Sequence, residues 1–176
     1  MEVKHFSLSL PTDQQRLRYG EPLFLSSEDG LDWYEIQTRF AADKTKIMYD
    51  SQGVIRGITH DASVFFPVGM SVADIDNLPP NCSNDGSWCY CEGKVMPNPI
   101  WSATQARKQQ VKLLHDVRQA MLPIITASAL NTLTAQQREH LLQLQAFELA
   151  VSTIDITEET AIGLIFPTWP KEIVHD

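Results

Sequence analysis

Three cysteines are the first residues in this sequence whose spacing suggests chemistry: Cys82, Cys89 and Cys91. Three thiolates together with a histidine such as His60 form a ligand set that zinc accepts. The spacing departs from the Cys-x2–4-Cys pairs of common zinc sites, and Tyr90 with the short turn after it leaves little room for an ion. We therefore expect no metal, and we interpret the cysteines as small side chains on a hairpin.

Two further pairs of residues raise the question of catalysis. His60 precedes Asp61, but adjacent residues point apart in extended chain, so a histidine base oriented by this carboxylate is not expected. Asp74 and Asp76 share one side of a predicted strand, as paired catalytic acids must. Alternation along that strand gives a simpler interpretation, a polar outer face. No phosphate-binding glycine motif is present. The sequence thus predicts no enzyme activity and no cofactor.

Size and charge limit the classes of protein to consider. The chain has 176 residues, of which 43% are hydrophobic and 20% charged, enough for one ordinary domain or two small ones. Its net charge of −8 argues against nucleic acid or an anionic membrane as the main partner. No apolar run approaches the ~20 residues that cross a bilayer, and the first residues lack the apolar core of a secretion signal. We expect a soluble intracellular protein without a disulfide framework.

Composition changes near residue 100. Residues 1–98 hold 8 Lys and Arg against 14 Asp and Glu, residues 99–150 hold 5 against 3 and no glycine, and residues 151–176 hold 1 against 5. We predict an α+β fold in which a small antiparallel β-rich domain, residues 1–98, is followed by a helical domain with an irregular tail, residues 99–176.

Short apolar or β-branched segments separated by turn residues indicate the strands of the first domain. We predict extended segments at 22–25, 33–40 and 72–75, and two hairpins, 46–49 with 54–58 and 87–90 with 94–96. Gly53 supplies the positive φ that a tight hairpin loop needs. The proline-containing segments between the hairpins should form no regular structure.

Two capping boxes indicate the helices. Ser102 and Thr134 each stand three residues before a glutamine, a pattern typical of helix N-termini. Pro123 should kink or end the first helix, which resumes over 124–130. The second helix should reach about Ser152.

The second helix carries more apolar surface than one packed face requires. One stripe contains Leu141, Leu144, Phe147, Val151 and Ile154, and an offset stripe contains Leu142, Ala146 and Leu149. We therefore expect self-association or a partner at this helix, with Leu144 and Phe147 as the candidate contacts.

A series of short motifs follows in a fixed order along the chain. It comprises Ser-Glu-Asp-Gly-Leu-Asp-Trp-Tyr-Glu at 27–35, Asp-x2-Lys-Ile-Met-Tyr-Asp at 43–50, Gly-Val-Ile-x-Gly-Ile-Thr-x-Asp-Ala-Ser at 53–63, Phe-Pro-x-Gly-x-Ser-Val at 66–72, Leu-Pro-Pro at 78–80, Asp-Gly-x-Trp-x-Tyr-x-x-Gly-x-Val at 85–95 and Trp-Pro at 169–170. This order and spacing resemble those of the tail fibre assembly proteins of Mu-like and lambda-like tailed bacteriophages. The likeness covers most of residues 27–176.

The resemblance implies a chaperone, not an enzyme, dedicated to a trimeric phage tail fibre. It implies that residues 1–98 bind the C-terminal region of the fibre and that residues 99–176 serve assembly, with no cofactor and no metal. The expected location is the host cell cytoplasm during assembly, with retention at the fibre tip in the virion. Residues 1–26 match no family motif, as a client-specific region would. Cys89 and Cys91 stand where family members vary.

Exposed aromatic residues and strand edges are the expected fibre contacts. The candidates are Phe24, Trp33, Tyr34, Phe40 and Tyr49. Each of them, taken singly, is better explained by core packing, because aromatic side chains dominate small cores. Two alternatives to the chaperone stay open at this point. One is a structural subunit that caps the fibre tip or binds the host receptor, and the other is a zinc-dependent hydrolase.

Overall fold

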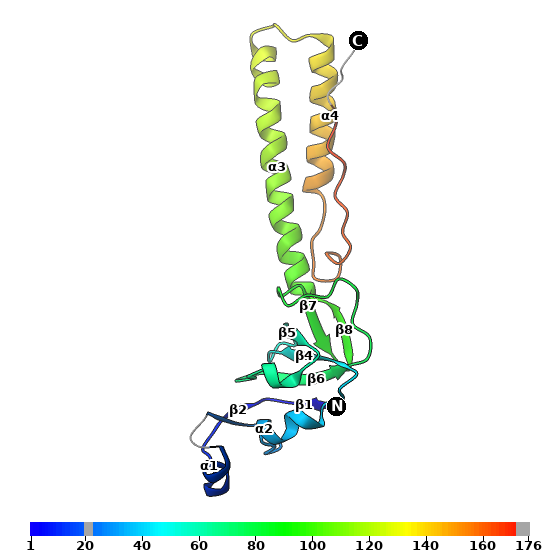
Figure 1. The fold of residues 1–176 in the computed structure, drawn as a ribbon. Helices are drawn as coiled ribbons and strands as arrows, with labels where there is room; N and C mark the ends of the chain where they lie inside the picture. The colour runs from blue at the N-terminus through cyan, green and yellow to red at the C-terminus, as the bar shows by residue number, and fades with distance from the viewer. Residues whose placement is uncertain (20–22, 172–176) are drawn as a thin grey trace. The chain divides into compact units, whose positions relative to one another are not determined.

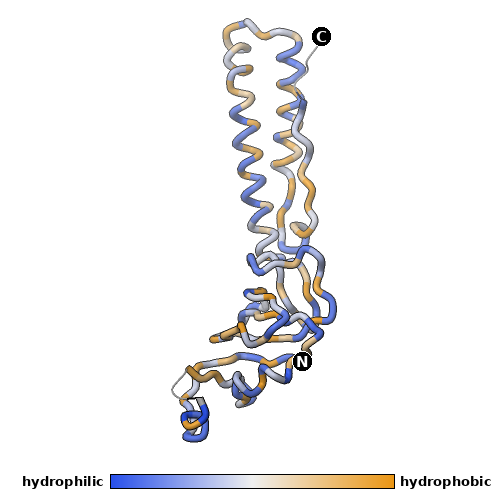
Figure 2. The backbone as a smooth tube through the Cα atoms, viewed as in Figure 1, coloured by the Kyte–Doolittle hydropathy of each residue, from blue (hydrophilic) through white to orange (hydrophobic). Residues whose placement is uncertain are grey.

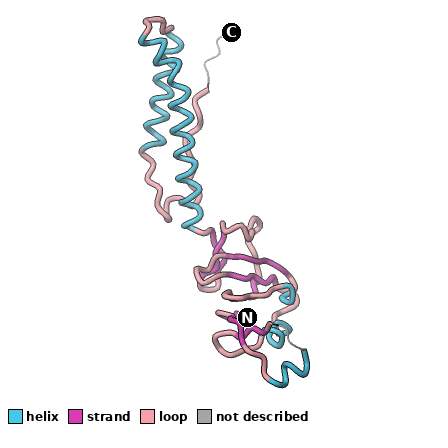
Figure 3. Tube along the Cα trace, turned by 90° about the vertical axis from the view of Figure 1, so that its left-hand side faces the viewer, coloured by secondary structure: helices cyan, strands magenta, loops and turns pink. Residues whose placement is uncertain are grey.

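The structure, a computed structural model, describes residues 1–19 and 23–171. The chain divides into two compact units, Met1–Asn98 (unit 1) and Pro99–Asp176 (unit 2). All described strands belong to unit 1, and the two long helices belong to unit 2 (Figures 1 and 3). The predicted α+β class is therefore confirmed.

A four-stranded antiparallel sheet lies at the centre of unit 1. In spatial order it contains β1 (Glu2–Val3), β6 (Ser71–Ile75), β4 (Thr45–Tyr49) and β5 (Ile55–Thr59). The β4–β5 hairpin was predicted, and Gly53 adopts the expected positive φ of 79° in its turn. The β1–β6 pairing was not predicted, because a two-residue strand leaves no periodic signal.

Two smaller ladders complete the strands of unit 1. The first pairs β2 (Ser7–Ser9) with β3 (Phe24–Ser26), and helix α1 (Asp13–Tyr19) lies between them in the sequence. The second is the predicted hairpin of β7 (Trp88–Cys91) with β8 (Lys94–Pro97). Of the apolar segment at 22–25, the last two residues belong to β3, and Pro22 lies outside the described residues.

The extended segment predicted at 33–40 is wrong. These residues form α2 (Trp33–Ile36) and the 3-10 turn η1 (Gln37–Arg39); a further 3-10 turn, η2, spans Ala62–Val64. Asp32 caps α2, because its carboxylate accepts a 3.1 Å hydrogen bond from the Glu35 amide. The helical turn buries Trp33 and Ile36 together. Local capping and burial thus outweigh the strand preference of the aromatic residues.

The central sheet is buried on both faces. Along β6, Val72 packs with Trp33 and Phe65 in one apolar cluster, whereas Ala73 and Ile75 pack in a second cluster with residues of β4 and β5. Neighbouring residues of a strand point to opposite faces, so β6 contributes to both clusters.

Unit 2 is a helical hairpin followed by a segment without regular structure. Helix α3 spans Pro99–Ala129, α4 spans Ala135–Ser152, and residues 130–134 form the distal turn between them. After α4 the chain runs back beside the helices (Figures 1 and 3), and the Trp169 ring meets the Phe147 ring at 5.1 Å.

The capping prediction holds for one helix and fails for the other. Thr134 forms the predicted capping box with Gln137, and α4 ends at Ser152 as expected. Helix α3 begins at Pro99 instead of near Ser102, since proline is favoured at a first helical position, where no amide hydrogen is needed.

Pro123 does not end α3. Met121 and Ile124, on either side of it, are both buried in the cluster that joins α3 to α4. Their packing against the second helix compensates for the hydrogen bond that proline removes. In the described part of the chain, no helix has both the length and the hydropathy needed to cross a membrane.

Candidate functional site

Four of the five aromatic residues expected to contact a fibre lie in the core. Phe24, Trp33, Phe40 and Tyr49 are at most 7% exposed. Tyr34 is half-buried: its ring meets Phe24 at 5.5 Å, and its hydroxyl donates a 3.2 Å hydrogen bond to a backbone carbonyl. The four buried side chains offer no area to a partner while unit 1 keeps this fold, so we no longer assign them to a contact surface.

Unit 1 exposes aliphatic residues that the sequence reasoning did not single out. Four leucines, hereafter the N-terminal leucines, are 57–89% exposed: Leu8, Leu10, Leu17 and Leu23. They fall within the segment that carries no family motif. The residue type does not predict their exposure, because leucine is more often buried than exposed. Exposure could have been inferred only from the lack of apolar periodicity around these residues.

A second exposed apolar group, hereafter the loop patch, lies in the loop before β6. Its members are Val64, Phe66 and Val68, which are 40–67% exposed, whereas Phe65 and Pro67 between them are buried. Successive side chains of this extended segment point alternately into the core and outward. The outward residues therefore lie on one side of the loop.

A polar cleft of about 350 Å³ lies in unit 1 between β1, the β4–β5 turn and β7. It is lined by Glu2, Lys4, His5, Tyr49, Asp50, Ser51, Gln52, Gly53, Ser71, Cys89, Tyr90, Cys91 and Glu92. Burial, followed by the hydrogen bond from the Tyr49 hydroxyl to the Glu2 carboxylate, raises the pKa of Tyr49 well above its usual range. The His5 Nδ1 lies 2.7 Å from a Glu28 carboxylate oxygen. This lining can hydrogen-bond a polar chain, and Tyr49 is held in its neutral form.

The thiols do not form the ligand cluster that the sequence raised as an alternative. Cys89 is buried, Cys82 half-buried and Cys91 exposed. Burial raises the pKa of both Cys82 and Cys89, which favours the thiol over the metal-binding thiolate. Among residues 1–19 and 23–171, no three His, Cys, Asp or Glu side chains come together in an arrangement that would hold a metal ion.

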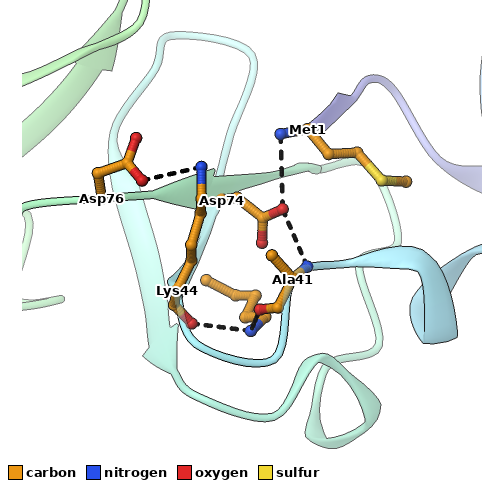
Figure 4. Close-up of polar contacts among 6 residues, drawn as sticks. Met1, Ala41, Lys44, Asp74 and Asp76 are labelled. Carbon is orange, nitrogen blue, oxygen red and sulfur yellow. Dashed lines mark hydrogen bonds and ion pairs between the residues drawn. The ribbon is translucent and has the colours of Figure 1, made fainter.

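The side chain of Asp74 is buried, so the expectation of a polar outer face is wrong at this position. Its side chain is 2% exposed, and its Oδ2 lies 3.5 Å from the Met1 amino group and accepts a 3.2 Å hydrogen bond from the Ala41 amide (Figure 4). Lys46 stands opposite Asp74 in the β4–β6 register and is itself 2% exposed. Its Nζ donates to the backbone carbonyls of Ala41 and Lys44. Both side chains thus contact main-chain groups near Ala41, and the second Asp74 oxygen, Oδ1, is buried without a hydrogen-bond partner among the described residues.

Asp76 has a different environment. Its carboxylate is 73% exposed and forms a 2.8 Å ion pair with Lys44 Nζ (Figure 4). One acid is thus buried, with one of its oxygens near two main-chain nitrogens, whereas the other acid is in solvent with a lysine. The described residues do not place them as two acids facing one substrate.

In unit 2 the two residues chosen for self-association are buried. Leu144 is 0% and Phe147 4% exposed, and both pack in the cluster between α3 and α4. The apolar face of α4 that reaches solvent belongs to the offset stripe, in which Leu142 is 61% and Leu149 65% exposed. Self-association stays a prediction, but Leu144 and Phe147 do not provide its surface.

Comparison with known proteins places these units in a family. The model of the family described as "Caudovirales tail fibre assembly protein, lambda gpK" matches residues 35–172. The chain is 32% identical over 181 residues to "Tail fiber assembly protein U" of Escherichia phage Mu, with 98% of each chain covered. It is 32% identical over 155 residues to the "Probable tail fiber assembly protein" of Escherichia phage P2, with 85% of this chain and 83% of that relative covered.

A third relative, "Tail fiber assembly protein U'" of Escherichia phage P1, is 28% identical over 153 residues and is covered to 85%. The matches extend through both units, and they confirm the resemblance noted in the sequence. The chain belongs to the family of Caudovirales tail fibre assembly proteins.

Proposed function

We propose that this protein is a chaperone that binds the C-terminal region of a trimeric phage tail fibre in the host cytoplasm. It promotes the folding, register and oligomerisation of the fibre without catalysis and without a cofactor. The observation that carries the proposal is the match to the phage Mu protein, which covers 98% of both chains. This match therefore also includes residues that precede residue 35, where the match to the family model begins.

The physics of fibre folding explains why such a partner is needed. Intertwined fibres depend on pairings between distant segments, which fold slowly and expose strand edges and apolar side chains meanwhile. A slip of one residue between strands reverses the face of every side chain. A small protein that covers the exposed apolar surface holds the chains in register and prevents aggregation.

Unit 1 is the fibre-binding domain in this proposal, and the N-terminal leucines form its contact surface. They lie before residue 35, where the family model begins its match, as expected of a region that recognises one client. Leu8 lies on β2, which belongs to a ladder of only two strands. Because such ladders are marginally stable alone, a strand from the fibre that extends the ladder stabilises both partners. Unit 2 serves as the assembly domain.

Co-expression with the C-terminal region of the cognate fibre tests the role. We expect soluble trimeric fibre with the protein and aggregated fibre without it. Equal yields of soluble trimer in both cultures would refute the chaperone. Should fibre form normally while particles that lack the protein fail to bind cells, the role would instead be that of a tip or receptor-binding subunit.

Two matched variants test the surface. In one, all four N-terminal leucines are replaced by serine; in the other, Val64, Phe66 and Val68 of the loop patch are replaced by serine. All seven positions are exposed, so both variants should keep the circular dichroism spectrum of the parent. We expect only the leucine variant to lose capture of the fibre fragment. Loss in the loop-patch variant alone would move the contact to that loop.

A further inference from the structure

Two tyrosines line the polar cleft of unit 1, to which the proposed function gives no role. The ring centroids of Tyr49 and Tyr90 lie 4.9 Å apart, and both residues belong to the lining. Tyr49 is 7% exposed, whereas Tyr90 is half-buried. The faces of aromatic rings carry partial negative charge and attract cations. The tyrosine pair therefore gives this cleft an aromatic component that favours a cation.

Acidic side chains outnumber lysine and arginine in the lining of the cleft. The acids are Glu2, Asp50 and Glu92, against Lys4. The Lys4 ammonium lies 3.8 Å from a Glu2 oxygen, which is longer than a hydrogen bond, and the Lys4 side chain is 50% exposed. Exposed ion pairs of this kind contribute little. Lys4 therefore leaves Glu2 open to a cation in a better position.

Two other charges beside the cleft are already paired. Arg56 Nη2 lies 2.9 Å from a carboxylate oxygen of Asp50, and the His5 Nδ1 contacts a carboxylate oxygen of Glu28. Glu92, in contrast, is exposed, and its side chain forms no hydrogen bond or ion pair with any residue that the structure describes. The surroundings of the cleft are therefore negative on balance, and Glu92 contributes an anion without a partner.

The pKa shifts of the two tyrosines agree with this negative charge. Burial, followed by the charge of Glu2, raises the pKa of Tyr90. Burial, followed by the hydrogen bond to Glu2 and the charge of Glu2, raises the pKa of Tyr49. A field that opposes the loss of a proton from a phenol also favours a bound cation. Glu2 thus acts on both rings of the lining.

The turn that carries Glu92 does not itself call for a glutamate. Glu92 and Gly93 form the two-residue turn between β7 and β8, with φ values of 48° and 83°. Turns with two positive φ values favour asparagine or aspartate before the glycine, because these short side chains tolerate this backbone region. A longer acidic side chain at this place costs some stability in the hairpin, and we attribute it to a contact made in the cleft.

The cleft adjoins the proposed contact surface. Its lining includes His5, and Leu8 follows three residues later, at most about 11 Å along the chain. Helix α1, which lies between β2 and β3 in the sequence, is mainly hydrophilic (Figure 2), but its charged residues are Arg16 and Arg18 against Asp13. That helix therefore does not attract a cation, whereas the cleft does.

We propose that the polar cleft binds an arginine side chain of the tail fibre. The choice of partner rests on the proposed function, whereas the chemistry rests on the cleft alone. A guanidinium is planar, stacks on aromatic rings and donates paired hydrogen bonds to carboxylates, so it matches tyrosines and glutamates better than the compact ammonium of lysine does. The volume of about 350 Å³ lies near the lower end for ligand pockets, which suits one side chain.

Titration of the ¹⁵N-labelled full chain with N-acetyl-arginine amide tests the chemistry. We expect saturable shifts of the backbone amides of residues 49–53 and 89–92, and none with the uncharged isostere N-acetyl-citrulline amide. Glu92→Asn should weaken binding about fivefold, and it should keep or raise the unfolding midpoint, because asparagine suits the turn. The matched control Asp43→Asn removes one charge at an exposed position outside the lining and should bind as the parent does. Equal binding of the two amides, or by the two variants, would overturn the proposal.

Capture of the C-terminal fibre fragment tests the source of the arginine. Saturating N-acetyl-arginine amide should weaken capture by the parent about fivefold or more, whereas the citrulline compound should have no effect. Unchanged capture while the cleft is occupied would overturn the proposal and leave the chaperone role intact. If the arginine compound binds but the parent never captures the fragment, the proposed function fails, and the assignment of the arginine to the fibre fails with it.

Discussion

In unit 1 the side chains that pack together come from distant parts of the chain. Phe6 meets Trp33 with ring centroids 5.1 Å apart, and the Trp33 indole donates a 3.1 Å hydrogen bond to the Phe65 carbonyl. In unit 2 the core instead joins two helices that are adjacent in the sequence, and large aliphatic residues are left over in solvent. Both units leave large aliphatic side chains in solvent, but the core of unit 1 depends on a few aromatic residues from distant segments, whereas the core of unit 2 is built between neighbouring helices.

The largest effect should come from Trp33→Ala. Removing this buried ring empties the cluster that holds α2, η2 and the sheet together, at a cost of about 3–5 kcal/mol. The control is Trp169→Ala in unit 2, where the ring is 39% exposed and the loss should be smaller. Urea unfolding followed by circular dichroism measures both. If the unfolding midpoint were unchanged while capture of the fibre was lost, Trp33 would have to contact the fibre directly instead of supporting the core.

Unit 2 offers a comparison between two leucines of one helix. Leu144→Ala should lower the free energy of unfolding by about 2–5 kcal/mol, because it leaves a cavity between α3 and α4. Leu142→Ala, at a position 61% exposed, should change it by less than about 0.5 kcal/mol. The loss of helical circular dichroism in denaturant reports both. Equal effects would mean that Leu142 is covered in solution, which bears on how α4 meets other chains.

Each unit contains a threonine–glutamine capping box, but one of the two helices buries side chains and the other does not. Thr134 caps α4, and Thr12 forms the equivalent pair of hydrogen bonds with Gln15 at the start of α1. Thr134→Ala should cost about 1 kcal/mol of unfolding free energy. Thr12→Ala should cost less in global stability, since none of the α1 side chains described is buried. Denaturant unfolding of the two variants ranks them, and the reverse order would show that α1 is docked more firmly than its exposure indicates.

Ionisation of tyrosine at alkaline pH should change the stability of unit 1 and not that of unit 2, because all four tyrosines precede residue 99. Burial, and then the hydrogen bond to Glu2, raises the pKa of Tyr49 in the folded chain. The unfolded chain thus loses this proton first, so the stabilisation is complete below the unfolded pKa of ~10 and is lost as the pH rises through the folded value. Tyr49→Phe should weaken the alkaline loss of stability in unit 1. Phenolate absorbance and unfolding measured across this range check it; an identical pH profile in both proteins would contradict it.

Local signals explain what the sequence could reveal of the fold. The β4–β5 and β7–β8 hairpins join neighbouring segments through turns with recognisable residues, and the Thr134 box marks the start of α4. Strand β1 pairs with β6, about seventy positions away, through only two residues, and no local pattern records such a pairing. The aromatic residues around Trp33 favour a strand, whereas the Asp32 cap favours a helix, and the sequence alone does not show that the cap prevails.

The candidate contact surface was harder to predict than the fold, because exposure is not a property of residue type. Trp33 and Leu144 combine large apolar side chains with nearly complete burial, whereas Leu10 and Leu17 are almost fully exposed. Which of several apolar residues enters a core depends on packing between distant segments. Family membership, in contrast, follows from ordered motifs and needs no knowledge of exposure.

Gly53 links the two predicted hairpins of unit 1 by main chain alone. Its carbonyl accepts a 2.7 Å hydrogen bond from the Tyr90 amide, and a Cβ at this position would lie 2.6 Å from the Tyr90 carbonyl oxygen. Val54 and Cys89 form an isolated antiparallel bridge beside this hydrogen bond. The turn of the β4–β5 hairpin therefore packs directly against strand β7 of the other hairpin. Lengthening that turn, or replacing Gly53 with any other residue, would consequently displace strand β7, which lies more than thirty residues downstream, so the length of this turn and the position of that strand are coupled.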